Sequence, residues 1–391
     1  MTYRIELVLM SFFGLFAMVS SALGQALTPS CYGIASSADG SKLAAVASYG
    51  GNGEIYTSTN SGATWTQQTN APNLNWFSVA SSADGSKLAA GPENGPIYIS
   101  TNSGVDWLPT TTSNTFWTSI ASSADGTKLV AANGHPDMGR IYHSDDSGLD
   151  WSSNNSPVLW WSGVASSADG TRLVAVATTG EIYTSTNSGD SWLWQGATGL
   201  YWIGVASSAD GTKLVAAQGG GAIYTSKNSG VNWTVTLAPT AAWDAVASSA
   251  DGSKLAAVSD GEYSVYPGLI ITSTNSGLTW ATNHFLPFTY WSSVASSADG
   301  NLLAATPYNN NKIYISQTTS APPLKLALST NNLCLSWIIP STNFVLQHNL
   351  DLTTTNWVAL TNAPTLNLTT LQDEVTVLPS SSSGFYRLTT P

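Results

Sequence analysis

The amino-acid sequence predicts an all-β chain, and three observations support this fold class. The phrase Ser-Ser-Ala-Asp-Gly occurs seven times, at intervals of 41 to 48 residues. Each repeat holds several short runs rich in Val, Ile, Tyr, Thr and Trp, separated by turns that contain Gly or Asn. No segment after the first 26 residues shows the periodicity of an amphipathic helix. Because this repeat length is typical of a propeller blade, we predict a seven-bladed β-propeller followed by a small C-terminal β-sandwich.

We number the repeats as units 1 to 7. Their phrases place an aspartate at Asp39, Asp84, Asp125, Asp169, Asp210, Asp251 and Asp299. In unit 2, four strands are expected at residues 76–81, 86–91, 96–101 and 105–111. A linear solenoid of the same period is the alternative fold. It would need atypical polar caps at both ends, and the sequence has none.

The first strand of each unit, which we call the inner strand, combines one large residue with small ones. Six units begin it with tryptophan, and unit 1 begins it with Cys31. The third residue is always Gly, Ser or Ala, and the fifth is always Ala. Alternate residues share one face of a strand, so this face is uniformly small. Such a face suits strands that crowd around a central axis.

A second phrase recurs in six units and resembles the Asp-box, or BNR, motif. Its first example is Ser58-Thr-Asn-Ser-Gly-Ala-Thr-Trp65, and unit 7 lacks it. The resemblance covers residues 31–320 and implies a propeller in which this box is the turn between the third and fourth strands. We expect its third residue to have a structural role, because a short Asn or Asp side chain can accept turn N–H groups. These residues are Asn60, Asn102, Asp146, Asn187, Asn228 and Asn275.

The two ends of the chain differ from the repeats. Residues 1–26 combine Arg4, an apolar run over 7–19 and small residues, so they predict a secretory signal peptide. The propeller is expected over 27–320. Residues 321–391 loosely resemble a fibronectin-III-like or immunoglobulin-like module. The two cysteines fall in different predicted domains, which favours free thiols over a bridge.

Composition limits the kinds of partner. Only 9% of the residues are charged and the net charge is −11. A nucleic-acid partner is therefore not expected, nor is a membrane span after signal cleavage. The four histidines show no metal-ligand spacing, so we predict neither a metal nor a cofactor. We expect a monomer located outside the cell or in its envelope.

Variation among the units indicates where binding occurs. The first and third turns of each unit are nearly invariant, whereas the connections between second and third strands, and between units, vary. Propeller topology gathers these variable loops at one face, where binding is common. Aromatic residues begin the inner strands at that face, and we predict that they bind a glycan or a protein. The candidates are Trp76, Trp117, Trp161, Trp202, Trp243, Trp291, Trp160, Tyr201 and Tyr290. Packing of the inner tryptophans within the core is the alternative interpretation.

An enzymatic function receives less support. The Asp-box resemblance extends to sialidases, which use three arginines, but residues 27–320 contain only Arg140 and Arg172. Photosystem-assembly factors are also similar in their repeats, although their arginine patch is missing here. Other glycosidases need two carboxylates, for which Asp244, Glu262 and Glu93 are weak candidates.

The function that we predict is therefore a secreted, non-catalytic binding scaffold that recognises a glycan or an extracellular protein. A glycoside hydrolase is the alternative, and a structural envelope or matrix protein is a third possibility.

Overall fold

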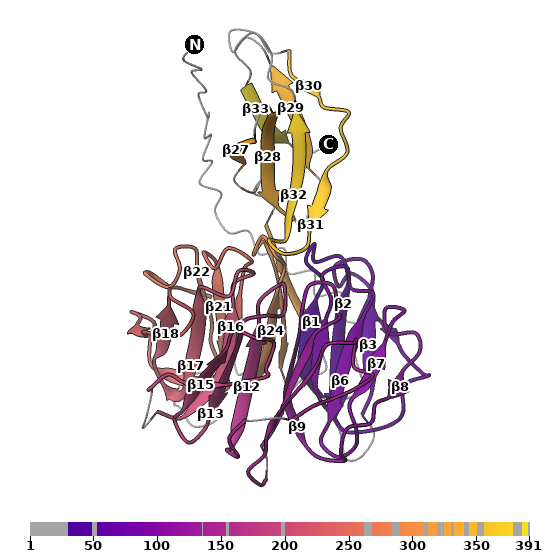
Figure 1. The fold of residues 1–391 in the computed structure, drawn as a ribbon, viewed down its shortest axis with the longest axis vertical. Helices are drawn as coiled ribbons and strands as arrows, with labels where there is room; N and C mark the ends of the chain where they lie inside the picture. Colours follow the sequence, from indigo (N-terminus) through magenta and orange to yellow (C-terminus); the bar gives the residue numbers. More distant parts are fainter. Residues whose placement is uncertain are drawn as a thin grey trace.

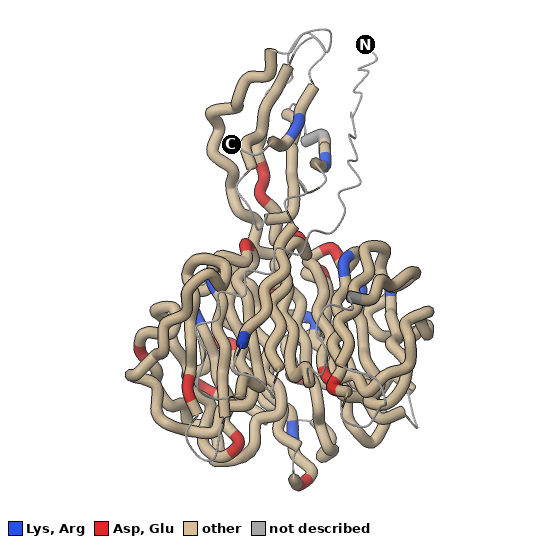
Figure 2. The backbone as a smooth tube through the Cα atoms, turned by 180° about the vertical axis from the view of Figure 1, so that it is seen from behind, with Lys and Arg blue, Asp and Glu red and all other residues tan. Residues whose placement is uncertain are grey.

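The computed structural model describes residues 30–48, 53–134, 136–153, 156–196, 200–261, 268–283, 290–307, 312–318, 322, 324–329, 332–339, 344–349, 356–377 and 385–389. The expected signal peptide (1–26) lies outside these residues. Within them the chain is all-β, as predicted, and no helix is long and apolar enough to cross a membrane. Figure 2 shows how sparsely the charged residues are distributed along the backbone.

Each unit folds as an antiparallel sheet in chain order. The inner strands are β1 (Ser30–Ser36), β5 (Trp76–Ser81), β9 (Trp117–Ser122), β12 (Trp161–Ser166), β16 (Trp202–Ser207), β20 (Ala241–Ser248) and β24 (Trp291–Ser296). The second strands are β2 (Leu43–Ser48), β6 (Leu88–Pro92), β10 (Leu129–Asn133), β13 (Leu173–Ala177), β17 (Leu214–Gly221), β21 (Leu255–Ser259) and β25 (Leu302–Pro307).

The third and outer strands complete the sheets. The third strands are β3 (Ile55–Ser58), β7 (Tyr98–Ser100), β11 (Ile141–Ser144), β14 (Ile182–Ser185), β18 (Ile223–Ser226), β22 (Ile270–Ser273) and β26 (Tyr314–Gln317). The outer strands are β4 (Thr66–Gln67), β8 (Leu108–Pro109), β15 (Leu193–Trp194), β19 (Thr234–Val235) and β23 (Ala281–Asn283). Unit 3 has a single bridge between His143 and Ser152 instead, and unit 7 has no fourth strand within the described residues.

The units close into a ring through the alanine of the Ser-Ser-Ala-Asp-Gly phrase. The amide of Ala38 donates to the carbonyl of Ala83 at 2.7 Å, and the same bond joins each unit to the next. The last bond runs from the Ala298 amide back to the Ala38 carbonyl at 2.7 Å. The bonded alanines are Ala38, Ala83, Ala124, Ala168, Ala209, Ala250 and Ala298. We call these residues the alanine ring.

Crowding at the axis explains why the inner strands carry small residues. A Cβ atom added at Gly33 would lie 3.0 Å from the Phe77 carbonyl oxygen of the next unit. That distance is shorter than an ordinary van der Waals contact, so the inner strands of units 1 and 2 leave no room for a side chain at Gly33.

Cations of the repeat connect neighbouring units. The Lys42 ammonium of unit 1 lies 3.3 Å from the Ser103 hydroxyl in the Asp-box turn of unit 2. Lys128 and Ser188 repeat the contact at 2.7 Å, and the Arg172 guanidinium repeats it at Ser229, at 3.1 Å. The invariant turns and the basic residues of the repeat therefore have a structural role.

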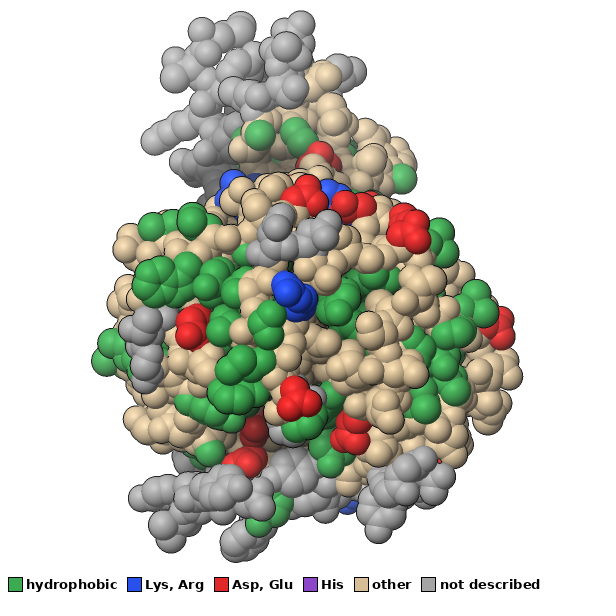
Figure 3. Space-filling model, turned by 60° about the horizontal axis from the view of Figure 1, so that its bottom comes forward, with side chains coloured by type: hydrophobic (Ala, Val, Ile, Leu, Met, Phe, Trp, Pro, Cys, Tyr) green, Lys and Arg blue, Asp and Glu red, His purple; other side chains and the backbone are tan. Residues whose placement is uncertain are grey.

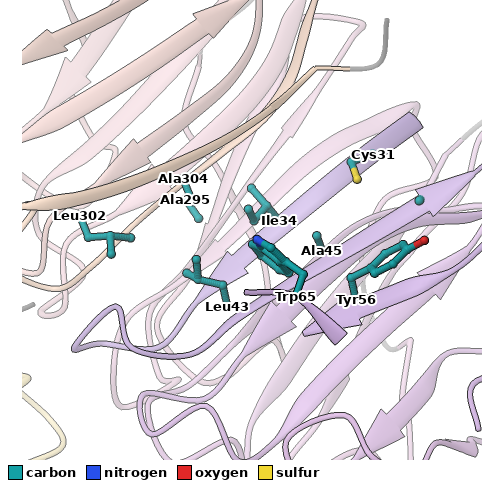
Figure 4. Packing of buried hydrophobic residues seen from close by; sticks show 10 residues of the cluster. Cys31, Ile34, Leu43, Ala45, Tyr56, Trp65, Ala295, Leu302 and Ala304 are labelled. Atoms are coloured by element: carbon teal, nitrogen blue, oxygen red, sulfur yellow. The ribbon is translucent and has the colours of Figure 1, made fainter. Parts of the chain in front are cut away.

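The seam between units 7 and 1 is built differently. Leu302 stands where the other units have Lys or Arg, and it is fully buried. Its cluster includes Cys31, Leu43 and Trp65 of unit 1, as Figure 4 shows. Burial, and secondarily the charge of Glu54, raises the pKa of the Cys31 thiol to about 12. The seam is therefore apolar.

The C-terminal module, residues 322–389, forms two further antiparallel sheets. One has the order β27 (Lys325–Ser329), β28 (Asn332–Ile338), β32 (Gln372–Val377), β31 (Thr365–Asn367), and the other β30 (Val358–Ala359), β29 (Val345–Asn349), β33 (Phe385–Thr389). Trp337 and Val375 of the first sheet share a hydrophobic cluster with Leu346 of the second. Both cysteines, Cys31 and Cys334, are free thiols.

Candidate binding face

The two ends of the ring differ in what they present. One end carries the Ser-Ser-Ala-Asp-Gly turns and the Asp-box turns, and we call it the constant face. The other end carries the loops that vary among units, and we call it the variable face. The C-terminal module stands on the constant face (Figure 1), where Leu371 packs against the alanine ring. The described part of the variable face has no such cover.

The constant face is held by carboxylates in repeated turns. Asp84 accepts hydrogen bonds from the Ser82 hydroxyl at 2.7 Å and the Ser86 amide at 2.9 Å. Burial acts to raise the pKa of Asp84, but these hydrogen bonds and the Lys42 charge outweigh it, so the pKa is lowered. The pKa of Asp125, Asp169 and Asp210 is lowered by the same balance of causes.

The six Asp-box turns share one pattern of hydrogen bonds. Asn60 Oδ1 accepts the Thr64 amide at 2.9 Å, and Ser58 Oγ accepts the Gly62 amide at 2.9 Å. Ser61 lies between Asn60 and Gly62 in the chain, and its φ of 56° is in the left-handed region. The third residues are Asn60, Asn102, Asp146, Asn187, Asn228 and Asn275, and each accepts a backbone amide four residues further along the chain.

The prediction that the inner-strand tryptophans bind a ligand is wrong. Each has 1% or less of its surface exposed, so none can present a ring to a partner. Trp202, for example, packs on Val174 and Ile182 of the preceding unit, and its indole N–H donates to the Gly180 carbonyl at 3.2 Å. The residues corrected in this way are Trp76, Trp117, Trp161, Trp202, Trp243 and Trp291. They seal the core between units, because each sheet face is covered by the next sheet.

Their aromatic neighbours are more accessible. Trp160 is 39% exposed and Tyr201 is 52% exposed, whereas Tyr290 is partly buried. The Tyr201 ring lies over Gly219, because a Cβ atom there would come 2.7 Å from Tyr201 Cδ1. These three residues remain candidates for contact with a partner at the variable face.

Sequence reasoning missed a set of residues at the variable-face end of the inner strands. In every unit the residue after the inner-strand tryptophan, or after Cys31 in unit 1, is skipped by the pairing with the next strand, which makes it a β-bulge. Bulges re-aim side chains and are common beside functional sites. The bulge residues are Tyr32, Phe77, Thr118, Ser162, Ile203, Asp244 and Ser292, and all are partly exposed. They vary from unit to unit, which was the available signal.

Three aromatic rings form a continuous line over units 1 to 3, and we call them the mouth cluster. The Tyr32 and Phe77 ring centroids are 5.7 Å apart, and those of Phe77 and Phe116 are 4.7 Å apart in an edge-to-face arrangement. Burial, followed by the negative charge of Glu93, raises the pKa of Tyr32. The mouth cluster is therefore partly desolvated and lies close to a carboxylate.

The hydroxyl-bearing bulge residues bond to the inner strand of the next unit. The Ser162 hydroxyl is 2.9 Å from the Trp202 carbonyl of the next unit, and the Ser292 hydroxyl is 2.7 Å from the Cys31 carbonyl across the seam. Thr118 contacts the Trp161 carbonyl at 3.0 Å in the same way. These hydroxyls join units, whereas the mouth cluster presents apolar surface.

The predicted carboxylates lie on different units. Asp244 is the bulge residue of unit 6, and Glu93 follows β6 of unit 2, where it accepts the Asn75 side-chain amide at 3.0 Å. Glu262 lies outside the described residues. Among the residues that the structure describes, no group of three or more His, Cys, Asp or Glu could hold a metal ion.

Figure 3 brings the end opposite the C-terminal module forward. Hydrophobic and acidic side chains are interspersed there with uncharged polar surface. A surface of this composition can make both apolar and polar contacts with a partner.

Comparison with known proteins identifies the fold. No protein-family model and no curated protein matches this chain. Among solved structures, "YCF48 bound to D1 peptide" is 18% identical, has a TM-score of 0.57, and the match covers 75% of this chain and 95% of that chain. Hydrazine synthase of Kuenenia stuttgartiensis is 15% identical, has a TM-score of 0.59, and the match covers 80% of this chain and 100% of that chain. The Cps50 (Swd1) β-propeller domain of Myceliophteria thermophila is 14% identical, has a TM-score of 0.57, and the match covers 75% of this chain and 98% of that chain. The chain is therefore a β-propeller.

Proposed function

We propose that this chain is a non-catalytic scaffold that binds a segment of a protein partner at the variable face. The observation that carries the proposal is the series of β-bulges at the variable-face end of the inner strands, whose residues differ from unit to unit and include Tyr32 and Phe77 of the mouth cluster. The opposite mouth is covered by Leu371. A rigid ring with adaptable residues at its open end is an arrangement that proteins use for recognition.

The proposal includes the architecture in which this scaffold is presented. It is a seven-bladed propeller over 27–320 with a C-terminal β-sandwich over 321–391, exported by the segment 1–26 as a monomer. The closed series of alanine hydrogen bonds supports seven blades, and the cluster shared by both C-terminal sheets supports the sandwich.

A protein partner is favoured by the chemistry of the mouth cluster. Tyr32, Phe77 and Phe116 offer contiguous aromatic surface, and aromatic residues are enriched among those that dominate the binding energy of protein interfaces. YCF48, which resembles this chain in fold, has been solved bound to D1 peptide, so a propeller of this kind can hold a peptide. We infer an apolar side chain of the partner seated on this cluster.

The test is an array of unrelated peptides, probed with the purified mature protein and followed by affinity measurement on each hit. Phe77→Ala should weaken binding at least about tenfold, because it removes the centre of the mouth cluster. Val231→Ala is the matched control, since Val231 is exposed in an Asp-box turn on the constant face. Equal affinities of both variants and the parent would refute the proposed site.

Binding of a glycan is the second candidate function. It is favoured by the exposure of Trp160 and Tyr201, whose rings could stack on sugar faces. A glycan array should then show binding that is lost in Trp160→Ala and Tyr201→Ala but retained in Phe77→Ala. Release of reducing sugar that is lost in Asp244→Ala would instead support the glycoside hydrolase, and inactivity in all three assays would leave a structural role.

A further inference from the structure

The C-terminal module contacts the ring through one turn on its axis. Leu371, between β31 and β32, packs against the cluster formed by Ala124, Ala168 and Ala209 of units 3 to 5. Leu371 has a φ of 52°, in the left-handed region that a leucine rarely adopts. Strain of this kind persists only where the surroundings hold it, so the contact is a specific one.

A second contact lies off the axis and falls on the seam. Ile338 and Ile339, at the end of β28, pack against Ala38 of unit 1 and Ala298 of unit 7. The Ile339 amide donates to the Leu371 carbonyl at 3.0 Å. This bond ties the contact on the axis and the contact on the seam into one element.

The seam is also where one connection of the repeat is missing. Leu302 replaces the basic residue, so unit 7 cannot repeat the contact that Lys42 makes with Ser103 of the following unit. The hydrogen bond from the Ala298 amide to the Ala38 carbonyl spans this seam directly beneath the two isoleucines.

We propose that the alanine ring is the docking surface for the chain's own C-terminal module, and that the module clamps the propeller closed at the seam. Ile338 and Ile339 bridge the first and last units, and Leu371 centres the module on the axis. A cavity of about 150 Å³ remains around Leu371, lined by the Ser-Ser-Ala residues of the units. The module thus rests on the rim of the channel and does not fill it. This role is independent of the binding function proposed above.

The proposal predicts a local effect that hydrogen exchange of the full chain can measure. In Ile339→Ala, the Ala298 amide at the seam should exchange at least about tenfold faster relative to the Ala168 amide, which makes the same bond between units 4 and 5. Leu371→Gly should instead accelerate exchange at Ala168, on which Leu371 packs, because glycine keeps the left-handed turn and removes only the side chain. Leu368→Gly is the matched control, since Leu368 is 41% exposed near the same turn.

The result can overturn the proposal in two ways. Unchanged exchange at Ala298 would show that the module is only an appendage, and an equal rise at Ala298 and Ala168 would show general rather than seam-specific stabilisation. If Ile339→Ala does not fold, Ile339→Val should accelerate exchange at Ala298 relative to Ala168 by a smaller factor. Equal exchange rates at the two amides in Ile339→Val would also overturn the proposal.

Discussion

Truncation of Leu302 should open the seam of the ring. The side chain is 0% exposed and lies among Leu43, Trp65 and Cys31. Its Cδ1 is also 3.1 Å from where a Cβ at Gly40 would stand, so the site is tightly packed. Leu302→Ala removes most of a fully buried side chain and leaves a cavity between two units. Substitutions of this kind cost about 2–5 kcal/mol, and we expect about 3 kcal/mol here.

Urea unfolding followed by tryptophan fluorescence measures this loss as a lower midpoint. Leu237→Ala is the control, because Leu237 is 85% exposed and its truncation should stay within about 0.5 kcal/mol. A loss below about 1 kcal/mol in Leu302→Ala, matching the control, would refute an essential apolar seam.

Three further predictions concern the core and the turns. Trp202→Ala should destabilise the fold by about 3–5 kcal/mol, measured as a lower urea midpoint, whereas Tyr201→Ala should leave it nearly unchanged. The pKa of Asp84 and of the equivalent aspartates in units 3 to 5 is lowered in the folded state. The stability that they contribute is therefore complete above the unfolded pKa of about 3.9 and is lost as the pH falls through the lower folded pKa. The melting temperature should hold from pH 7 to pH 5 and fall below about pH 4. In a Cys334→Ser background, Cys31 should resist alkylation at pH 8 until urea unfolds the chain, because its pKa is raised to about 12; labelling of the native protein would contradict its burial.

The repeated turns were predictable because their chemistry is local. Asp84 accepts hydrogen bonds from residues two positions away on either side, and that pattern is written into the Ser-Ser-Ala-Asp-Gly phrase. The small third residue of the inner strand likewise indicated crowding, which the close approach at Gly33 explains. Neighbouring residues therefore carried enough information for the fold.

The binding face was harder to predict because exposure depends on the packing of whole sheets. Alternation places Trp202 and Tyr201 on opposite sides of the chain, but it does not reveal which side meets solvent. In a propeller both faces of a sheet are covered by the neighbouring sheets, so Trp202 is buried. Solvent reaches the chain at the ends of the strands, where Tyr201 lies. The bulge at Phe77 depends on register with β6, which sequence periodicity alone does not show.

The contact of Leu371 with the ring could not be predicted for a related reason. It joins a single hairpin turn to alanines that lie far from it in the sequence. The invariance of those alanines was the available signal, but in the sequence it marked only a repeated turn.

Near-identical units raise the question of what sets their number. A head-to-tail contact that any unit could make with any other would allow chains to join end to end without limit unless the geometry closes. Leu302 makes the last unit unlike the others, because it places an apolar side chain where the other units place a cation. We expect this difference to favour closure of the ring within one chain over head-to-tail joining of separate chains.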